Sequence, residues 1–408
     1  MNTKQTDRRT RRTRRALRST YGAVAAAAVL ATLAGAAAPA AAGAGTPDPW
    51  VYSWGQNASG ELGNGSTVEQ HTPGPVQGLA REDVKELGAG GLTVTGPFAV
   101  ALLKNGTLKS WGDNKYGQLG NGSVQARSFP AAVAGLNGVK SLAVGCGHAL
   151  ALKSGRVWAW GRNDNGQLGD GTTSAKDIGS PKPVAVQGLD KVKAIAAGCH
   201  FSMALRQDGT VWTWGANNRG QLGIGTNSNH NTPQKVPGLG HVTALAASSY
   251  HSAVLTTDHT VTTWGAGTAG QLGNDTVADS TTPVEVKHLE GVEKLFGGAH
   301  TDFALMSDGS VKGWGHNNVG QLGDGTTVNR TTAVPIDGLN GVRDIVASNQ
   351  HAVALLDDQS VVSWGLNANG QLGNGSTESA AKPVTTLAAG SGVNHLAAGR
   401  NAHFTFAY

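Results

Sequence analysis

The stretch WGHNNVGQLGDG, residues 314–325, decides the fold. Its opening Trp-Gly pair recurs seven times along the 408-residue chain, at spacings of 57, 49, 54, 50, 50 and 50 residues. Each pair is followed by Gly-Gln-Leu-Gly or a near copy such as Gly60-Glu61-Leu62-Gly63. The seven tryptophans are Trp54, Trp111, Trp160, Trp214, Trp264, Trp314 and Trp364. Such self-similarity at a nearly constant period predicts a repeat architecture.

A single unit of this repeat, residues 292–341, has the pattern of four short strands. We expect the first at Lys294–Phe296, the second at Phe303–Met306, the third at Val311–Trp314 and a fourth extended segment near Pro335. Ser307-Asp308-Gly309-Ser310 predicts a tight hairpin in which Asp308 and Gly309 adopt positive φ. The Gly-rich segment after the tryptophan predicts a turn that needs left-handed dihedral angles.

A four-stranded antiparallel unit of this size cannot bury both faces alone and must stack on its neighbours. Repeated four-stranded units with aromatic and Gly motifs indicate a β-propeller. Residues 50–55 read as the third strand of a unit, whereas residues 395–399 and 404–408 read as the first two strands. We therefore predict an all-β, seven-bladed propeller in one domain, residues 50–408, closed by a blade split between the two termini. An open solenoid, the alternative, would leave exposed strand edges at both ends.

The first 42 residues predict an export leader. The formal net charge is +5, but residues 1–18 contain eight of the 32 Lys and Arg and only one of the 27 acids. An uncharged Ala-rich stretch and a small-residue segment, residues 36–42, follow, which is the order of a signal peptide. Thr13–Arg18 partly matches the twin-arginine export motif. A retained membrane anchor is the alternative.

Removal of residues 1–42 leaves a net charge of −2, so the basic excess belongs to the leader. We expect a secreted protein with a short linker at residues 43–49 and no integral membrane segment in the mature chain. We also expect no nucleic-acid partner, since nucleic-acid binding requires a basic surface.

The repeat resembles the regulator-of-chromosome-condensation family. The segment from Ala143 to Leu152, the following Trp160-Gly161 and the Gly166–Gly169 turn carry the resemblance, and all seven units share it. The resemblance implies seven blades of about 50 residues, in agreement with the count made from the spacing. The founder of that family is a nuclear nucleotide-exchange factor that binds chromatin, a role that neither an export leader nor a slightly acidic mature chain suits.

A second branch that this chain resembles is the secreted propeller-type β-lactamase inhibitory proteins. In that branch, aromatic residues in the Gly-x-x-His loop contact the target enzyme. The corresponding pairs here are Cys146 and Gly147, Cys199 and His200, Ser249 and Tyr250, Ala299 and His300, Asn349 and Gln350, and Arg400 and Asn401. Tyr250 is the one aromatic residue among them, and binding hot spots favour Trp, Tyr and Arg.

Six histidines occupy similar places before the second strand of their units: His148, His200, His251, His300, His351 and His403. A ring of imidazoles could bind a metal. However, their registers relative to the next apolar residue differ, and a shift by one residue moves a strand side chain to the other face. We therefore expect these histidines to bond to backbone at the blade edge, and we predict no catalytic residue, metal or cofactor.

Cys146 and Cys199 are the only cysteines and occupy matched positions in neighbouring units. An exported protein can keep a disulfide between them if their Cα atoms lie within about 7 Å. Two free buried thiols remain the alternative.

Irregular loops on a rigid scaffold are further places for function. The long spacings place insertions at residues 87–98 and 174–183, the second of which carries Lys176, and the loop at residues 226–234 carries His230. We predict a monomeric, non-enzymatic module that binds an unknown extracellular protein. The candidate contacts are Tyr250, His200, His300, Arg400, Lys176 and His230. Inhibition of an extracellular enzyme such as a β-lactamase is the first alternative, and an enzyme sited in the central channel, with or without a metal, is the second.

Overall fold

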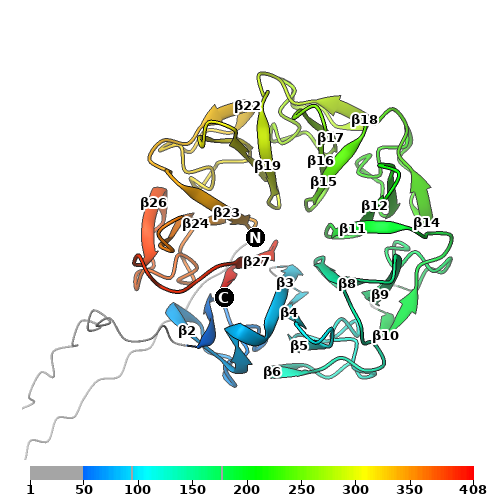
Figure 1. Cartoon of the computed structure of the whole chain (residues 1–408), viewed down its shortest axis with the longest axis horizontal. Coiled ribbons are helices and arrows are strands. Elements are labelled where there is room, and N and C mark those ends of the chain that lie inside the picture. The colour runs from blue at the N-terminus through cyan, green and yellow to red at the C-terminus, as the bar shows by residue number, and fades with distance from the viewer. Residues whose placement is uncertain (1–48, 93–94, 176–177) are drawn as a thin grey trace, which may run out of the picture. The chain divides into compact units, whose positions relative to one another are not determined.

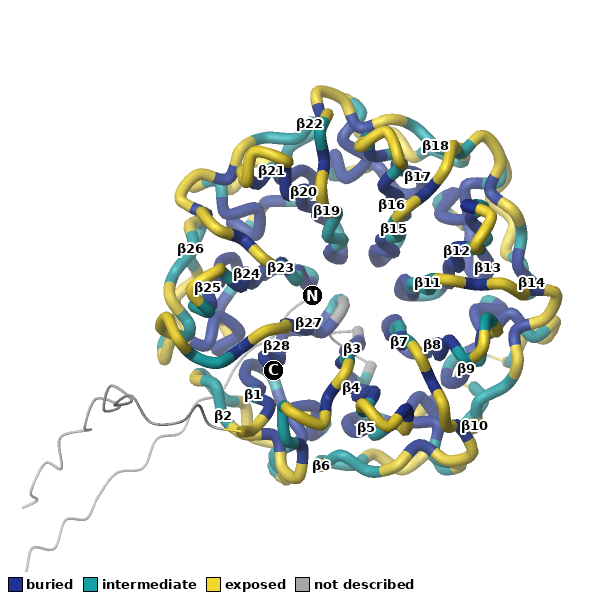
Figure 2. Tube along the Cα trace, viewed as in Figure 1, coloured by how far each residue is buried: buried dark blue, intermediate teal, exposed yellow. Residues whose placement is uncertain are grey.

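The computed structural model describes residues 49–92, 95–175 and 178–408, and these form a ring of blades around a central channel (Figure 1). The predicted leader, residues 1–42, lies outside the described residues, as do residues 43–48 of the predicted linker and Lys176. In the ring, buried residues follow the strands, whereas exposed residues collect in the links and hairpins (Figure 2).

Each blade has four strands, which we number from the channel outwards. Blade 1 has β27 (Leu396–Arg400), β28 (Phe404–Ala407), β1 (Trp50–Gly55) and β2 (Gln70–Ala80). Blade 2 has β3 (Val84–Leu92), β4 (Thr95–Leu103), β5 (Leu108–Gly112) and β6 (Arg127–Ala132), and a 3-10 turn, η1 (Arg81–Asp83), precedes it. Blade 3 has β7 (Ser141–Val144), β8 (His148–Lys153), β9 (Arg156–Arg162) and β10 (Gly179–Ala185).

The remaining four blades follow the chain in the same order. Blade 4 has β11 (Val192–Ala197), β12 (Phe201–Arg206), β13 (Val211–Gly215) and β14 (His230–Lys235). Blade 5 has β15 (Val242–Ala247), β16 (His251–Thr256), β17 (Val261–Gly265) and β18 (Ser280–Glu285). Blade 6 has β19 (Val292–Gly297), β20 (Thr301–Met306), β21 (Val311–Gly315) and β22 (Arg330–Pro335). Blade 7 has β23 (Val342–Ala347), β24 (His351–Leu356), β25 (Val361–Gly365) and β26 (Ala380–Leu387).

The two ends of the chain share blade 1, as the sequence predicted. β1 pairs antiparallel with β28, with Trp54 opposite Thr405, and β27 pairs antiparallel with β28. A feature that the sequence did not predict is a parallel pairing of β27 with β3, with Gly399 opposite Ala89, which joins blades 1 and 2 into one mixed sheet of eight strands. The ring is therefore closed both within the split blade and across its edge.

The repeated tryptophans connect each blade to the one before it. All seven side chains are fully buried, with no exposed area. The indole N–H of Trp364 donates to the carbonyl oxygen of Gln321 at 2.9 Å, and the other six make the same bond to the Gln or Glu of the preceding turn at 2.8–3.2 Å. Trp54 donates to Gln371 and so completes the circle. The Trp-Gly and Gly-Gln-Leu-Gly motifs are thus the two halves of one inter-blade contact.

The turn that receives the tryptophan depends on glycine. Gly323 has φ +79°, and a Cβ atom there would lie 2.8 Å from Nε1 of Trp364. Within the same turn, the Asn317 side chain accepts a hydrogen bond from the Leu322 N–H at 2.9 Å. Both the left-handed backbone and the close approach of the ring therefore exclude larger residues.

The hairpins differ in one respect from the sequence prediction. Gly309 has φ +83°, but Asp308 is not among the residues with positive φ. The Asp308 carboxylate instead accepts bonds from the N–H (2.9 Å) and the hydroxyl (2.6 Å) of Ser310. The prediction of positive φ for Asp308 was wrong, because its side chain stabilises the turn by an Asx-type bond and only the glycine needs the left-handed region.

The ring has two faces, which we name by their connections. The loop face carries the links from first to second strands and the Gly-rich links from third to fourth strands. The hairpin face carries the second-to-third hairpins and the links between blades. The predicted insertion at residues 87–98 lengthens β3 and β4 to nine residues each and extends from the loop face.

Candidate functional site

The six histidines fall into two structural positions. His148, His251 and His351 begin second strands and lie opposite the glycine of Trp-Gly in the third strand. His200, His300 and His403 lie one residue earlier, because Phe201, Thr301 and Phe404 take that place opposite the glycine. The difference in register is therefore real, and it separates fully buried histidines from histidines at the loop face.

The fully buried histidines bond to the next blade. Nε2 of His148 lies 2.9 Å from Oγ of Ser202, and Nε2 of His351 lies 3.0 Å from Oγ1 of Thr405. Nε2 of His251 lies 2.9 Å from a carboxylate oxygen of Asp302, which is itself fully buried. We expected bonds to backbone at the blade edge. That prediction was wrong for these three, because Nε2 of each bonds to a polar side chain in the second strand of the neighbouring blade.

The half-exposed residues at the loop face form a row of rings across three blades. His200 of blade 4, Tyr250 of blade 5 and His300 of blade 6 have neighbouring centroids 6.2 and 6.0 Å apart. The rings of Tyr250 and His300 are nearly parallel, at 17°, and His316 meets His300 edge-on at 6.1 Å. Three of the predicted contact residues are thus brought together, with His316 as an addition.

Arg162 of blade 3 extends this row towards blade 2. Its guanidinium lies 5.0 Å from the ring centroid of Tyr116, within the range of a cation–π contact. It also pairs with Asp164, with Nε 2.9 Å from Oδ1. We use the name aromatic arc for Tyr116, Arg162, His200, Tyr250, His300 and His316, which span blades 2 to 6 on the loop face.

The imidazoles of the aromatic arc are neutral at pH 7. Burial lowers the pKa of His200 to about 4, and the nearby Arg162 cation contributes in the same direction. Burial likewise lowers the pKa of His300 to about 4 and reduces the pKa of His316 below its ordinary value. A charged imidazole would lose its hydration at these positions, so the arc presents ring faces and neutral donors and acceptors.

The other predicted contact residues lie elsewhere. His230 begins β14, the outermost strand of blade 4, opposite Gly215. Its neighbour Asn231 donates to Gly171 O of blade 3 at 2.8 Å, so this loop serves to join blades. Arg400 ends β27 at the channel, where its backbone pairs with Gly90 of β3. The structure does not group either residue with the aromatic arc.

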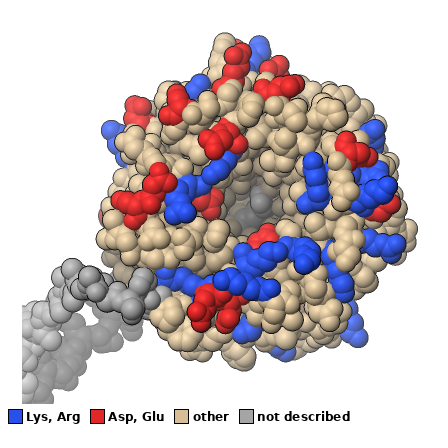
Figure 3. Space-filling model, in the orientation of Figure 1, with Lys and Arg blue, Asp and Glu red and all other residues tan. Residues whose placement is uncertain are grey.

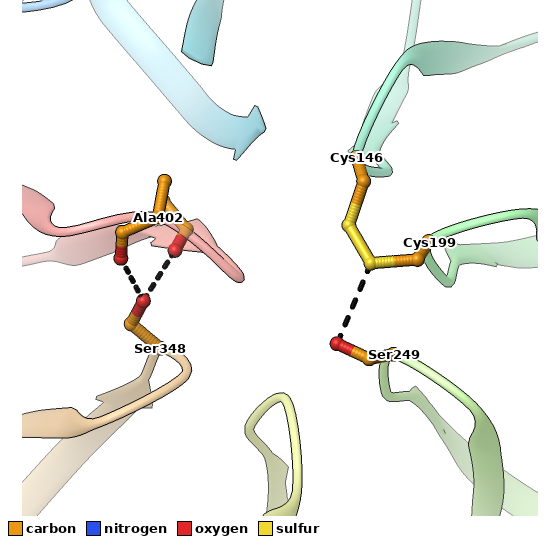
Figure 4. Close-up of a disulfide and its surroundings, with 6 residues drawn as sticks. Cys146, Cys199, Ser249, Ser348 and Ala402 are labelled. Carbon is orange, nitrogen blue, oxygen red and sulfur yellow. Dashed lines mark hydrogen bonds between the residues drawn. A yellow bond between two sulfur atoms is a disulfide. The ribbon is translucent and has the colours of Figure 1, made fainter. Parts of the chain in front are cut away.

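Cys146 and Cys199 form a disulfide between blades 3 and 4, with Cα atoms 4.3 Å apart (Figure 4). The first-to-second links continue this contact around the channel. Cys199 N–H donates to Ser249 O at 3.4 Å, and Ser249 N–H donates to Ala299 O at 3.0 Å. Ser348 then places its hydroxyl 2.6 Å from Gly399 O and close to Ala402 O. The disulfide is therefore the covalent part of a collar that ties blades 3 to 7 and blade 1 together at the loop face.

The central channel has an apolar wall. A cavity of about 290 Å³ is lined by Leu, Ile, Val, Ala and Gly of the innermost strands, among them Leu87, Leu142 and Ile345. No titratable side chain is among its lining residues in the described part of the chain. Lys and Arg side chains, with Asp and Glu side chains among them, lie around the central opening in the view of Figure 3.

Two further findings concern residues 49–92, 95–175 and 178–408 only. In these ranges no group of three or more His, Cys, Asp or Glu residues could hold a metal ion. Within the same ranges no helix is long and apolar enough to cross a membrane.

A family model described as the RCC1-like domain matches residues 50–406. The chain belongs to the RCC1-like domain family. Human E3 ubiquitin-protein ligase HERC2 is 33% identical over 192 residues, which cover 45% of this chain and 4% of that protein. The ultraviolet-B receptor UVR8 of Arabidopsis thaliana is 30% identical over 187 residues, which cover 45% of this chain and 41% of that protein. The chain thus spans less than half the length of either relative.

Two solved RCC1-like structures resemble the ring. Human WBSCR16 matches with a TM-score of 0.77 and 23% identity, covering 88% of this chain and 99% of that one. Prp20p of Saccharomyces cerevisiae, described with its binding properties to Gsp1p and histones, matches with a TM-score of 0.76 and 21% identity, covering 88% of this chain and 90% of that one. At these identities the likeness shows the fold.

Sequence reasoning missed three members of the aromatic arc in this RCC1-like propeller. Arg162 and His316 occupy the position directly after Trp-Gly, and Tyr116 lies in the same link of blade 2. The position after Trp-Gly differs in almost every blade: it is Gln56, Asp113, Arg162, Ala216, Ala266, His316 and Leu366. This variation at one position of an otherwise regular motif could have marked Arg162 and His316 as candidate functional residues in the sequence.

Proposed function

We propose that this chain is a secreted, non-enzymatic module that binds a protein partner through its loop face. RCC1-like propellers are a domain type that mediates protein binding. The observation that carries the choice of face is the distribution of exposed apolar side chains. Among the described residues, five of the seven large exposed hydrophobic side chains lie in third-to-fourth links of the loop face, namely Val68, Val124, Ile178, Val277 and Val328.

These aliphatic side chains lie on the same face as the aromatic arc. Exposed apolar groups rimmed by polar residues are typical of interaction sites. Tyr and Arg are also the residues that most often dominate binding energy. The loop face therefore offers rigid aromatic rings near its centre and aliphatic side chains at its margin. The hydrogen bonds from the buried tryptophans to the Gly-rich turns hold these loops in place.

Secretion is part of the proposal and rests on the leader pattern of residues 1–42. The Cys146–Cys199 disulfide supports it, because disulfides persist in oxidising compartments. We further propose that the partner is extracellular and that the mature chain acts as a monomer, without nucleic acid.

The proposal is tested with leader-free protein, residues 43–408, as bait in culture supernatant. Tyr250→Ala removes the central ring of the arc. Thr257→Ala, an exposed residue of the hairpin at the other end of β16, is the matched control. We expect a protein that the wild type and Thr257→Ala retain and Tyr250→Ala loses. Equal retention by both variants would exclude the loop face.

Inhibition of an extracellular enzyme is the sharper second candidate, and Tyr250 is the observation that favours it. Its ring lies in the loop that carries the enzyme contacts in the resembling inhibitor branch. We expect the wild type, but not Tyr250→Ala, to inhibit a β-lactamase or another secreted hydrolase at near-stoichiometric ratio. Absence of inhibition across such a panel leaves the general binding role intact and rejects the inhibitor role.

A further inference from the structure

The loop face contains a pocket that extends from the aromatic arc to Thr268 and Gln271. It has a volume of about 520 Å³ and lies where blades 4, 5 and 6 meet, in the links that follow β13, β17 and β21 and beside Tyr250 and His300. Its lining residues are Asn218, Arg219, Tyr250, Ala266, Thr268, Ala269, Gln271, His300 and His316. This volume falls in the range of small-molecule sites.

A departure from the repeat opens this pocket. Blade 6 has His316-Asn317-Asn318 after Trp-Gly, whereas blade 5 has Ala266-Gly267-Thr268. In blade 6 the Gln321 amide donates to Nδ1 of His316 (3.2 Å) and Oδ1 of Asn318 (3.4 Å). In blade 5, Ala266 has no acceptor in place of His316, and the Thr268 hydroxyl accepts from Arg219 at 3.3 Å. The larger side chains that fill this turn in blade 6 are therefore missing in blade 5.

Gln271 forms the floor of the pocket with an unused donor. Its side chain is 2% exposed, and its Oε1 accepts the Ala269 N–H at 2.7 Å. That bond fixes the orientation of the amide and leaves Nε2 facing the pocket, where no described residue is recorded as its acceptor. This amide donor at the wall of the pocket is available to a ligand oxygen.

The surrounding donors are neutral. Gln321 Oε1 accepts from the Val319 N–H at 3.0 Å, so Gln321 Nε2 must donate to Nδ1 of His316. The proton of the neutral His316 ring is therefore on Nε2, which makes this ring a donor and not a metal ligand. Arg219 adds no net charge, because its guanidinium pairs with Asp279 at 2.8 Å.

Aromatic ring faces form the walls of the pocket, and hydroxyl and amide side chains form its rim. Tyr250 and His300 present their nearly parallel rings, and Asn218 and Thr268 lie exposed at the edge. A flat face of C–H groups packs well against aromatic rings, and several neutral donors suit a ligand with several oxygen acceptors. A single aromatic side chain of a protein partner would use the rings but at most one or two of these donors.

We propose that this pocket binds a neutral saccharide, with one sugar ring against Tyr250 and His300 and a hydroxyl or ring oxygen accepting from Gln271 Nε2. The pocket shares Tyr250, His300 and His316 with the aromatic arc, but a saccharide is a different ligand from the protein partner proposed above.

The test is calorimetric titration of the leader-free protein at pH 8 with maltotriose, cellotriose and chitotriose. A trigalacturonate and inorganic phosphate serve as anionic probes. We expect at least one neutral trisaccharide to bind and the anionic probes not to bind. Preferential binding of the anionic probes, or no binding of any trisaccharide at 10 mM, roughly the weak end of specific recognition, would overturn the proposal.

Two variants locate the site. Gln271→Glu keeps the acceptor for Ala269 but replaces the donor, and Glu61 shows that this turn tolerates the residue. Its control is Gln371→Glu, because Gln371 occupies the same position of its turn but is not among the residues that line this pocket. We expect Gln271→Glu to weaken binding by roughly tenfold, as for loss of a buried hydrogen bond, and Gln371→Glu to leave it unchanged.

Ala266→Leu fills the pocket with the residue that blade 7 has at the same position, Leu366, and Ala216→Leu makes the same change in blade 4. We expect Ala266→Leu to abolish saccharide binding and Ala216→Leu to preserve it. Thermal unfolding of each variant confirms that it is folded. Unchanged affinity in folded Ala266→Leu and Gln271→Glu would place the saccharide elsewhere and refute the assignment.

Discussion

At the scale of the residue, the informative positions are those where one blade departs from the other six. Glu61 replaces the Gln of the Gly-Gln-Leu-Gly motif in blade 1 and is fully buried. Ser59 N–H donates to its Oε2 at 2.7 Å, but its Oε1 has no recorded partner among the described residues. Burial raises the pKa of this carboxyl to about 7, and the Asp113 charge adds to the rise. The folded protein therefore holds a proton there that the unfolded chain releases.

Glu61→Gln should change the dependence of stability on pH. With the folded pKa at about 7 and the ordinary value of a glutamate at 4.5, stability is lost as pH rises from about 4.5 to 7. The loss reaches about 3 kcal/mol. We expect Glu61→Gln to raise the free energy of unfolding at pH 8 by up to about that amount and to have little effect at pH 4. Urea unfolding at both pH values measures this, and an equal effect at both would contradict the assigned pKa.

Gln359 departs from the repeat in the hairpin of blade 7. Its φ is +65°, whereas the matching residues Gly209 and Gly309 have φ of +81° and +83°. Left-handed backbone costs a non-glycine residue about 1 kcal/mol or more. We therefore expect Gln359→Gly to stabilise the protein by about 1 kcal/mol and the reverse change, Gly309→Ala, to destabilise it by about the same amount. A lower melting temperature for Gln359→Gly would show that its side chain outweighs the backbone strain.

At the scale of the element, a blade is completed by its neighbour. The third strand supplies a tryptophan, and the turn that receives it belongs to the blade before. Phe303 of blade 6 meets the Trp364 ring edge-on at 5.9 Å, so the same side chain also packs across the blade interface. The strands form because of local patterning, but their stability resides between blades.

Trp364→Phe tests that contact. It removes the indole donor to Gln321 O and leaves a void in a fully buried site. We expect a loss of about 2–4 kcal/mol. Trp212→Phe is the matched control, because this half-buried indole bonds within its own hairpin, to Thr210. Chemical denaturation measures the free energy of unfolding of both variants. A similar loss in both would show that the inter-blade bond contributes no more to stability than a bond within one hairpin.

At the scale of the whole molecule, the question is how the ring is closed. The split blade, the parallel β27–β3 pairing and the collar of links each join parts of the chain that are distant in sequence. The disulfide adds a covalent link between blades 3 and 4 at one point of that collar, over a separation of 53 residues.

Reduction of the disulfide should lower stability without changing the fold. Loss of a cross-link over a loop of this length costs about 4 kcal/mol in the chain-entropy model, and less where the links retain their hydrogen bonds. We expect Cys146→Ser/Cys199→Ser and the reduced wild type to unfold at the same, lower temperature, with unchanged circular dichroism at 20 °C, a temperature roughly at maximum stability. If reductant lowers the melting temperature of the double variant as well, the effect is not due to this disulfide.

Much of the architecture could be predicted because its determinants are local and repeated. Each Trp-Gly, each Gly-rich turn and each hairpin recurs at a nearly constant spacing, so the number of blades and the split at the termini could be read from residues alone. The exceptions were also local in origin. Asp308 stabilises its hairpin through its side chain and not through positive φ, and this alternative has the same Asp-Gly signature.

The candidate site depended on tertiary structure. By itself the sequence determined the blades, the tryptophans that join them and the loops that carry Tyr250, His200 and His300. Whether those loops meet depends on the curvature of the ring, which brings residues about 50 positions apart within ring contact and leaves His230 on an outer strand. The pocket beside Gln271 likewise exists only because small residues of one blade face the side chains of two others. Local patterning specifies each element, whereas closure of the ring decides which irregular residues become neighbours.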